Sequence, residues 1–464
     1  MRKLSLYCLS GLLLLWSCSP KSTTEEKPGK AVRLITVDPG HFHAALVQKV
    51  MYADVDSTVH VYAPEGPDLK MHLDRINAFN SRAEDPTHWN EVIFSGEHFF
   101  ERMLQEKPGN VVVLSGNNQR KTEYILKSLQ AGLNVYADKP MVIDAAGFDQ
   151  LTKAFDIAAK NKLLLYDIMT ERFEITTILQ RELSMMPDIF GELEKGSPEH
   201  PAITKESIHH FYKYVSGSVL TRPAWFLDTE QQGEGIVDVM THLADLVQWE
   251  AFPEQALDYK KDITINTARR WTTDIPLSKF RTITKLDAFP EYLKKNVVSD
   301  SILKVSSNGE VNYQLRGVHA KTSVIWYYES KDGSGDTHFS MMRGTKANLA
   351  IKQGPEEKYK VTLYIEPVKS DKAYEQVVAD NFRKLEEKYP GIALEKNKTG
   401  LAGGQAGWVV TIPDKYKDGH EAHFGRVTEN FIDYLKNGNI PAWEVPNMLA
   451  KYYTTTQALE VSKK

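Results

Sequence analysis

The chain has 464 residues, of which 42% are hydrophobic, and a formal net charge of -4. This length allows two domains with sizeable cores. No basic cluster stands out after Arg2-Lys3, which argues against nucleic acid as a partner. The two cysteines, Cys8 and Cys18, are too few for a disulfide framework.

The first residues predict an export signal. Arg2-Lys3 precede an apolar run at residues 12–15, which is too short for a stop-transfer helix. Leu15-Trp16-Ser17-Cys18 is similar to a bacterial lipobox, so we expect signal residues 1–18 to be removed and Cys18 to carry lipid. An ordinary cleaved signal is the alternative. Loss of Cys8 with the signal would leave no internal disulfide and no cysteine metal site.

Residues 19–30 are polar and read as a flexible tether. The sequence therefore predicts an exported protein of the bacterial cell envelope, in the periplasm or at the outer membrane. We expect it to touch the membrane only through its lipid anchor, because no later apolar run is long enough to span a bilayer.

Residues 31–170 alternate short apolar strands with amphipathic helices. Such alternation predicts an α/β domain with a doubly wound parallel sheet, whose ligands bind at the carboxyl ends of the strands. We expect strands at 32–37, 58–62, 110–114, 135–137 and 163–166, and helices at 44–51, 124–131 and 148–159.

Residues 171–464 predict a second α/β domain with one open, largely antiparallel sheet. Two inserts, Asp274–Asp300 and Asp371–Gly407, are expected to interrupt this sheet. The second insert holds a helical pattern at 374–389 and a glycine-rich loop at 400–404. We expect sheet strands at 207–214, 311–315, 323–328, 337–341 and 361–365, and closing helices at 427–435 and 445–459.

The stretch Gly233–Asp245 carries the clearest chemical pattern. Helical spacing places Asp238 and His242 one turn apart on one face, and Asp245 one turn further. A carboxylate beside an imidazole suits general acid–base work, because histidine titrates near neutral pH. The alternative is a helix with a solvated polar face.

The order of motifs resembles the glucose–fructose oxidoreductase/inositol dehydrogenase family (Gfo/Idh/MocA). The matching segments are Asp138-Lys139-Pro140, Arg172-Phe173, Gly233–Asp245 and Gly344–Leu349. The resemblance implies a Rossmann-like domain at 31–170, bound NAD or NADP, and hydride transfer from a carbinol carbon. It also implies that the C-terminal helices pack back on the first domain and that the chain forms a homo-oligomer, a dimer through the open sheet.

The family's first glycine turn is altered here. Gly-x-Gly-x-x-Gly becomes Asp38-Pro39-Gly40-His41-Phe42-His43, which keeps only the glycine that lets backbone approach the pyrophosphate. Asp38 can instead bond backbone amides of the turn or cap the helix. Asp38, His41 and His43 could also ligate a metal, but nothing else nearby completes such a site, so no metal is expected.

The resemblance and the strand ends together give a set of cofactor-binding candidates. Glu65 lies at the usual distance for a ribose-contacting acid, and a plain loop carboxylate explains it equally well. Ser115-Gly116-Asn117-Asn118 replaces the family's Thr-Pro-Asn turn. The candidates are Asp38, Gly40, His41, Phe42, His43, Glu65, Ser115, Asn117, Asn118, Asp138, Lys139 and Pro140.

The family's reaction assigns roles to three residues. His242 would take the hydroxyl proton as general base, Lys139 would stabilise the reacting oxygen, and Asp238 would orient the substrate or His242. Substrate-binding candidates are Asp238, His242, Arg172 and Trp225. Arg172 is also expected to support the domain junction, and Trp225-Phe226 could either stack on a sugar ring or fill the interdomain core.

Four histidines fall outside these motifs: His209, His210, His420 and His423. A surface role is expected for His420 and His423, although both could reach the substrate cleft.

Three functions follow. The first is an NAD(P)-dependent oxidoreductase of a sugar, polyol or glycoside. The second is a glycoside-cleaving enzyme that oxidises, eliminates and reduces with a retained cofactor, since free NAD is scarce outside the cytoplasm. The third is a non-catalytic sugar- or nucleotide-binding lipoprotein, which the altered glycine turn favours.

Overall fold

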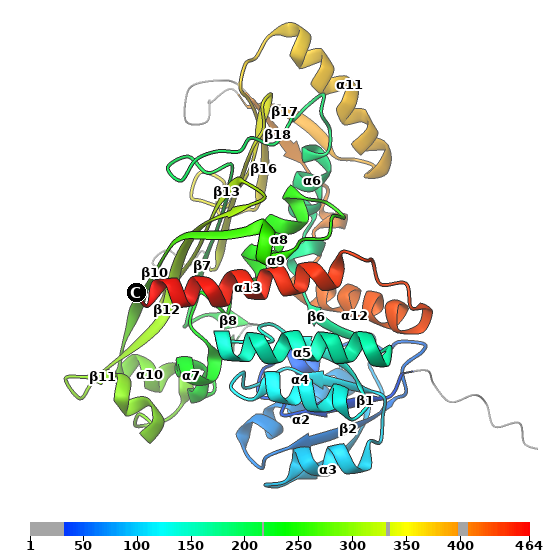
Figure 1. Cartoon of the computed structure of the whole chain (residues 1–464), viewed down its shortest axis with the longest axis vertical. Coiled ribbons are helices and arrows are strands. Elements are labelled where there is room, and N and C mark those ends of the chain that lie inside the picture. The colour runs from blue at the N-terminus through cyan, green and yellow to red at the C-terminus, as the bar shows by residue number, and fades with distance from the viewer. Residues whose placement is uncertain (1–31, 216–217, 331–334, 398–406) are drawn as a thin grey trace, which may run out of the picture.

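The computed structural model describes residues 32–215, 218–330, 335–397 and 407–464. The expected signal, Cys18 and the tether lie outside these residues. Figure 1 shows the N-terminal domain in blue and cyan at the bottom and the C-terminal sheet in green and yellow above it. The helix α13 (Glu444–Ser462) runs between these two parts.

The N-terminal domain is built on six parallel strands in the order β3-β2-β1-β4-β5-β6. This confirms the expected Rossmann-like sheet. The order reverses between β1 and β4, and ligands bind at such a switch point. The strands are β1 (Leu34–Val37), β2 (Thr58–Ala63), β3 (Asn90–Ser95), β4 (Val111–Leu114), β5 (Asn134–Asp138) and β6 (Leu165–Ile168).

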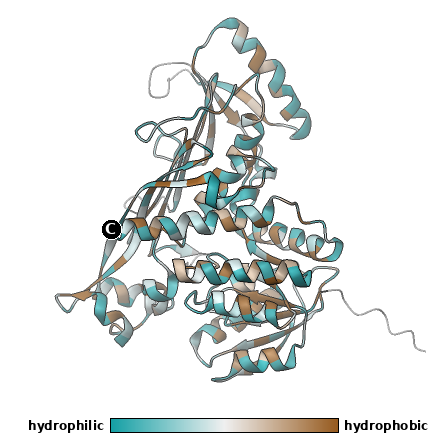
Figure 2. Cartoon of the chain, viewed as in Figure 1, coloured by the Kyte–Doolittle hydropathy of each residue, from teal (hydrophilic) through white to brown (hydrophobic). Residues whose placement is uncertain are grey.

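Helices cover both faces of this sheet. Figure 2 shows hydrophobic and hydrophilic stretches alternating along α3 and α5, as expected of helices with one buried face. The expected helix at 44–51 is wrong in length, because the chain turns after Leu46 through short i→i+3 bonds. The helices are α1 (His43–Leu46), α2 (Pro67–Ser81), α3 (Phe99–Glu106), α4 (Lys121–Gln130) and α5 (Ala145–Asn161).

The C-terminal domain is organised on a sheet in the order β10-β12-β13-β7-β14-β15-β16-β18-β17. Only β13 and β7 pair in parallel along this path, so the sheet is largely antiparallel as expected. The strands are β7 (Ile203–His210), β10 (Ile263–Pro276), β12 (Ile302–Leu315), β13 (Val318–Tyr327), β14 (Thr337–Arg343), β15 (Ala347–Lys352), β16 (Thr362–Pro367), β17 (Ala393–Asn397) and β18 (Gly407–Thr411).

Both expected inserts are partly sheet, which corrects their boundaries. The long strand β10 runs into the first insert as far as Pro276, because it pairs with β12 over its whole length. In the second insert, α11 (Lys372–Lys388) is followed by β17, which pairs with β18 at the sheet edge. The glycine-rich loop at 400–404 lies outside the described residues.

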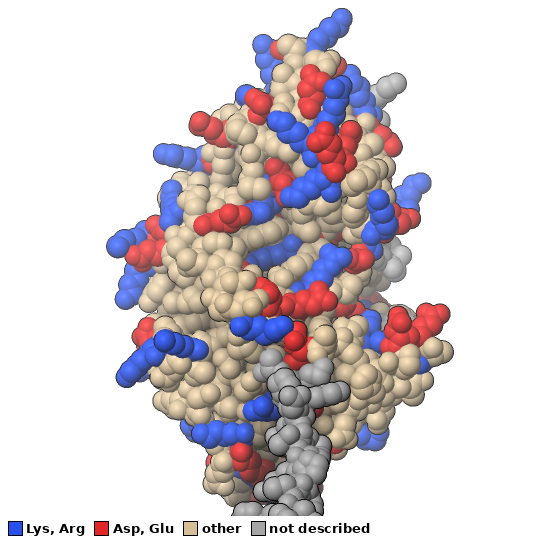
Figure 3. Space-filling model, turned by 90° about the vertical axis from the view of Figure 1, so that its right-hand side faces the viewer, with Lys and Arg blue, Asp and Glu red and all other residues tan. Residues whose placement is uncertain are grey.

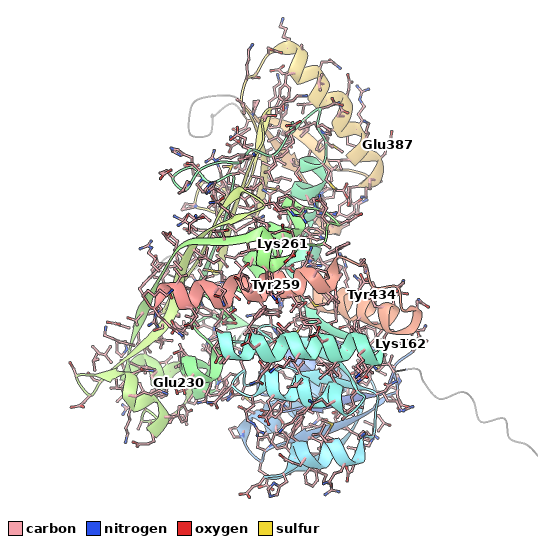
Figure 4. The ribbon with its side chains drawn as sticks, in the orientation of Figure 1. Lys162, Glu230, Tyr259, Lys261, Glu387 and Tyr434 are labelled. Carbon is pink, nitrogen blue, oxygen red and sulfur yellow. The ribbon has the colours of Figure 1, made fainter. Side chains whose placement is uncertain are left out.

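The last two helices join the domains. Phe431 of α12 (His420–Asn437) stacks on Tyr136 of β5 with ring centroids 4.4 Å apart. On the other side, Tyr259, which is labelled in Figure 4, contacts Phe148 of α5 and Tyr453 of α13. These aromatic contacts pack the C-terminal helices and Tyr259 against β5 and α5 of the first domain.

The stretch Gly233–Asp245 differs from the expected helix at its start. The helix α8 spans Met240–Ala251, so Asp238 lies in the turn before it. Gly235 explains this turn, because a Cβ there would lie 1.9 Å from the carbonyl oxygen of Ser307 on β12. Because the backbone approaches β12 so closely, residues 235–239 form an irregular turn where a helical turn was expected. Asp238 and His242 nevertheless both line the same cavity.

On the face shown in Figure 3, basic and acidic side chains are interspersed. No broad basic surface is seen there, in keeping with the small net charge. Among the described residues, no helix is both long and apolar enough to cross a membrane.

Candidate active site

A cavity of about 470 Å³ lies between the two domains, at the carboxyl ends of the parallel strands. The N-terminal domain contributes side chains that follow β1, β4 and β5, and the C-terminal domain contributes α8 and the strands around it. Its walls include His41, Asn118, Asp138, Lys139, Asp238, His242 and Trp326. This is where the doubly wound fold is expected to bind ligands.

Lys139 and Asp238 meet across the cavity as an ion pair. The Nζ of Lys139 lies 2.6 Å from Oδ1 of Asp238, and Gln232 donates to the other carboxylate oxygen at 3.0 Å. Burial by itself raises the pKa of Asp238, but the Lys139 ammonium and the hydrogen bonds hold it below its usual value. Asp238 is therefore a carboxylate locked in place by its two neighbours.

His242 lies four residues beyond Asp238, in the first turn of α8, and faces the same cavity. Its Nδ1 is buried without a hydrogen-bond partner within the described residues. Burial and the charge of Lys139 lower the pKa of His242 to about 3. The imidazole is thus neutral at physiological pH and can accept a proton, but it is a weaker base than an imidazole whose pKa lies near the working pH.

A second group of polar side chains gathers on Asp138, at the end of β5. His41 Nδ1, His43 Nδ1 and Ser115 Oγ all lie 3.0–3.1 Å from the same atom, Oδ2 of Asp138. Burial raises the pKa of Asp138, but the two histidines hold it well below its ordinary range. The histidines predicted near Asp38 therefore converge on Asp138 instead, because β1 and β5 end at the same edge of the sheet.

Neighbouring parts of the chain pack closely around the altered glycine turn. A Cβ on Gly116 would lie 1.9 Å from the carbonyl oxygen of Asp38, and one on Gly40 would lie 3.0 Å from the Trp225 indole. Trp225 also donates from Nε1 to Asp68 Oδ2 at 2.7 Å. Trp225 thus covers Gly40 and does not line the cavity, which favours its interpretation as interdomain packing.

Asp38 has a left-handed backbone at φ 49°. Burial and the nearby Asp68 raise the pKa of the Asp38 carboxyl to about 6. Two carboxyl groups thus stand close to the place where the family's turn receives pyrophosphate. Glu65 lies beyond β2 as an exposed side chain.

The segment after β4 is held by the short helix α7 (Thr229–Gln232). Asn117 donates to the Gln231 side chain at 2.7 Å, and Asn118 donates to the carbonyl of Gln232 at 2.7 Å. The side-chain oxygen Oδ1 of Asn118 is buried and has no partner within the described residues. Asn118 thus presents an unused acceptor beside the cavity, whereas Asn117 has a structural role.

Arg172 is bound at the domain junction rather than at the cavity. Its guanidinium bonds both carboxylate oxygens of Asp245 at 2.6 and 2.7 Å and both oxygens of Glu444 at 3.0 Å. The expectation that Arg172 binds substrate is therefore corrected, because both edges of the guanidinium are already used. Its expected role at the junction agrees with these contacts.

Comparison with known proteins places the chain in a family. Residues 179–463 match the family model described as "Putative oxidoreductase C terminal domain". The chain belongs to this oxidoreductase family. A crystal structure described as a "putative oxidoreductase" from Parabacteroides merdae ATCC 43184 is 56% identical, has a TM-score of 0.90, and covers 94% of this chain and 98% of its own.

More distant solved structures share the fold of this oxidoreductase family member. KijD10, a 3-ketoreductase from Actinomadura kijaniata in complex with NADP and TDP-benzene, is 13% identical with a TM-score of 0.54. A "putative myo-inositol dehydrogenase" from Sinorhizobium meliloti 1021 is 14% identical with a TM-score of 0.53. Each covers 93% of this chain and 97% of its own. No curated protein matches the chain. The Gfo/Idh/MocA-type fold is thereby confirmed.

The far wall of the oxidoreductase cavity holds residues that the sequence did not reveal. His209 Nδ1 lies 3.2 Å from Asp336, Lys213 donates to the same carboxylate at 2.8 Å, and buried Arg222 also lines the wall. His420 is exposed as expected and also lines the cavity, whereas the surface role expected for His423 is wrong because this side chain is buried; His210 is buried as well, and His209 lines the cavity. Only folding brings β7, Asp336 and α12 to this cavity.

Proposed function

We propose that this protein transfers hydride between a nicotinamide cofactor and a carbinol carbon of a sugar, polyol or glycoside. One observation carries the proposal: Lys139, Asp238 and His242 meet in one cavity at the carboxyl ends of the parallel sheet. They come from opposite domains and face space large enough for a small ligand. Membership of an oxidoreductase family supports the reaction class.

The nicotinamide end of the cofactor fits the residues present. Asn118 Oδ1 is a buried acceptor without a partner, and Gly116 leaves the wall beside it free of side chain. The pyrophosphate end fits less well, since the Trp225 indole covers Gly40 and the carboxyl groups of Asp38 and Asp68 are close to where the phosphates would bind. A dinucleotide in this turn would therefore place its pyrophosphate beside Trp225 and these two carboxyl groups.

When bound, the nicotinamide supplies the hydride acceptor. The chain's own residues accept the proton of the substrate hydroxyl and stabilise the negative charge on its oxygen. His242, whose imidazole is neutral and lines the cavity, takes the hydroxyl proton of the substrate. Lys139 stabilises the oxygen as it gains alkoxide character, and Asp238 fixes the ammonium of Lys139 in place.

Cofactor titration tests the proposal. The purified protein is examined for co-purifying nicotinamide by its absorption spectrum, stripped, and titrated with NAD and NADP while tryptophan fluorescence is recorded. Binding should change the fluorescence of the parent protein more than that of Trp225→Phe, which lacks the indole over Gly40. Failure of both cofactors to bind at millimolar concentration would refute a nicotinamide mechanism.

A second candidate is glycoside cleavage by oxidation, elimination and reduction with a retained cofactor. The observation that favours it is a second imidazole: His209, bonded to Asp336, stands in the same cavity as His242. Elimination next to a new carbonyl needs a base to remove a carbon-bound proton. Release of the aglycone without net reduction of added NAD would distinguish this reaction from simple dehydrogenation.

We also propose that the protein is exported and anchored by lipid on Cys18. The support is the apolar run that ends in Leu15-Trp16-Ser17-Cys18. The tether at 19–30 would then hold the oxidoreductase near the membrane surface.

A homodimer through the open face of the C-terminal sheet is proposed as well. Its support is the resemblance in fold and the long strand β10 at the sheet edge. Light scattering behind a sizing column distinguishes a dimer from a monomer.

A further inference from the structure

We propose that His41, His43 and Asp138 form a binding site for a divalent transition-metal ion. The inference concerns metal binding itself and goes beyond the proposed hydride transfer. Two imidazoles and one carboxylate place their ligand atoms within 4.8 Å of one another at the wall of the cavity. Two histidines and a carboxylate are a ligand set that Zn²⁺ and Fe²⁺ use in catalytic sites.

The distances match a coordination sphere. Both imidazole Nδ1 atoms lie 3.0–3.1 Å from Oδ2 of Asp138. Ligand atoms bound tetrahedrally to one Zn²⁺ ion stand about 3.4 Å apart, given bonds of about 2.1 Å. A small expansion of this group would therefore admit the ion.

Hydrogen bonding alone accounts for the arrangement less well. His41, His43 and Ser115 all approach the single oxygen Oδ2. A carboxylate oxygen offers about two lone-pair sites, so three donors compete for them. A metal ion shared by the imidazoles and the carboxylate removes this competition, because the imidazole nitrogens then act as lone-pair donors.

Rigid elements hold the three ligands in place. His41 and His43 follow β1, and Asp138 ends β5, so neighbouring parts of one sheet edge position them. The side chains of His43 and Asp138 are 9% and 3% exposed, whereas that of His41 is 22% exposed. The cluster is thus open on the His41 side, where water or an oxygen atom of a small molecule would complete the coordination.

The surrounding charges set the expected affinity. Lys121 donates to the main-chain carbonyl of Asp138 at 3.1 Å and opposes a cation, while Lys139 is neutralised by Asp238. One carboxylate and two imidazoles thus face one opposing ammonium, so binding should be weaker than at a site without Lys121.

Metal analysis of the whole mature protein tests the inference. Tag-free protein is stripped with chelator and dialysed, then titrated with Zn²⁺ and with Mn²⁺ by calorimetry, without nicotinamide or sugar. Bound metal is counted by elemental mass spectrometry. We expect about one ion per chain and a rise in Tm on metal addition.

Three variants locate the ion: His41→Gln, His43→Gln and Asp138→Asn. Each should weaken Zn²⁺ binding by at least about 100-fold, the upper end of what removing an outer-sphere partner costs. His209→Gln is the matched control, because that histidine also bonds a carboxylate in the same cavity. The circular dichroism of each stripped variant shows whether the fold is retained.

Two results would overturn the site: less than about 0.1 ion per chain in the parent protein, or Zn²⁺ binding that is lost in His209→Gln and kept in the three variants. If a variant fails to fold, X-ray absorption of Co²⁺-loaded parent protein decides, since a site without imidazole scattering contradicts the assignment. Metal binding with no hydride transfer would refute only the proposed function, and the reverse result only the metal site.

Discussion

The Nζ of Lys139 lies 2.6 Å from Oδ1 of Asp238, and this ion pair joins the two domains across the cavity. Both side chains are largely buried, with 11% and 7% exposed. Removing one partner of a buried pair leaves an uncompensated charge, which costs more than the pair itself contributes. The pair thus links the stability of the junction to the chemistry of the site.

Lys139→Met should destabilise the protein by about 3–5 kcal/mol at pH 7, because Asp238 loses its counter-charge. The pKa of Asp238 is lowered in the folded state, so its stabilising contribution exists above the unfolded pKa and fades as pH falls. The difference between parent and variant should therefore shrink below about pH 4. Urea unfolding at several pH values measures it, and the double variant Lys139→Met/Asp238→Asn should recover part of the loss.

His242→Asn should lower single-turnover hydride transfer by about 10²–10⁴-fold, the usual effect of losing a positioned base. Cofactor affinity should stay near that of the parent protein, since Asn118 and the first turn are unchanged. His319→Gln, on β13 and away from the cavity lining, serves as control. Transfer at the parent rate in His242→Asn would move the role of base to another residue.

The pH profile of kcat/KM should show no acid limb from His242 near its ordinary pKa. Burial and Lys139 lower that pKa to about 3, so the imidazole stays neutral from about pH 5 upward. Nuclear magnetic resonance of the His242 ring gives the same information directly. A limb between about pH 6 and 7 that disappears in His242→Asn would contradict this environment.

Arg172→Met should reduce stability by about 3–5 kcal/mol, because Asp245 and Glu444 lose a buried partner. The KM of the folded fraction should not change, since Arg172 does not line the cavity. Arg269→Met is a matched arginine change at an exposed pair with Glu310 and should cost less than about 1 kcal/mol. A raised KM with unchanged stability would restore Arg172 as a substrate ligand.

Cys18→Ala should move the protein from the membrane fraction to the soluble fraction. The acyl chains on the cysteine would supply the membrane affinity, and no described helix could replace them. Fractionation of cells that express either form, with labelled fatty acid as a second readout, checks this. Full membrane partitioning of the variant would show that another feature holds the protein there.

The sequence by itself determined the layers and the order of motifs. Apolar runs such as Val111–Leu114 are buried on both faces, and a continuous apolar run of this kind predicts a strand of a parallel sheet. Lys139, Asp238 and His242 could be placed in one cavity because the order of the motifs resembles that of a family with a known fold. The edge strand β3 was missed, since none of its residues is buried and its sequence shows no apolar–polar alternation.

Only the tertiary structure decided which distant groups meet. His41 and His43 bond Asp138 rather than Asp38, Trp225 covers Gly40, and His209 reaches the cavity. Each contact joins residues far apart in the chain, so no local periodicity encodes it. Strand order and the docking of the two domains set these distances, and they arise from the packing of the whole chain.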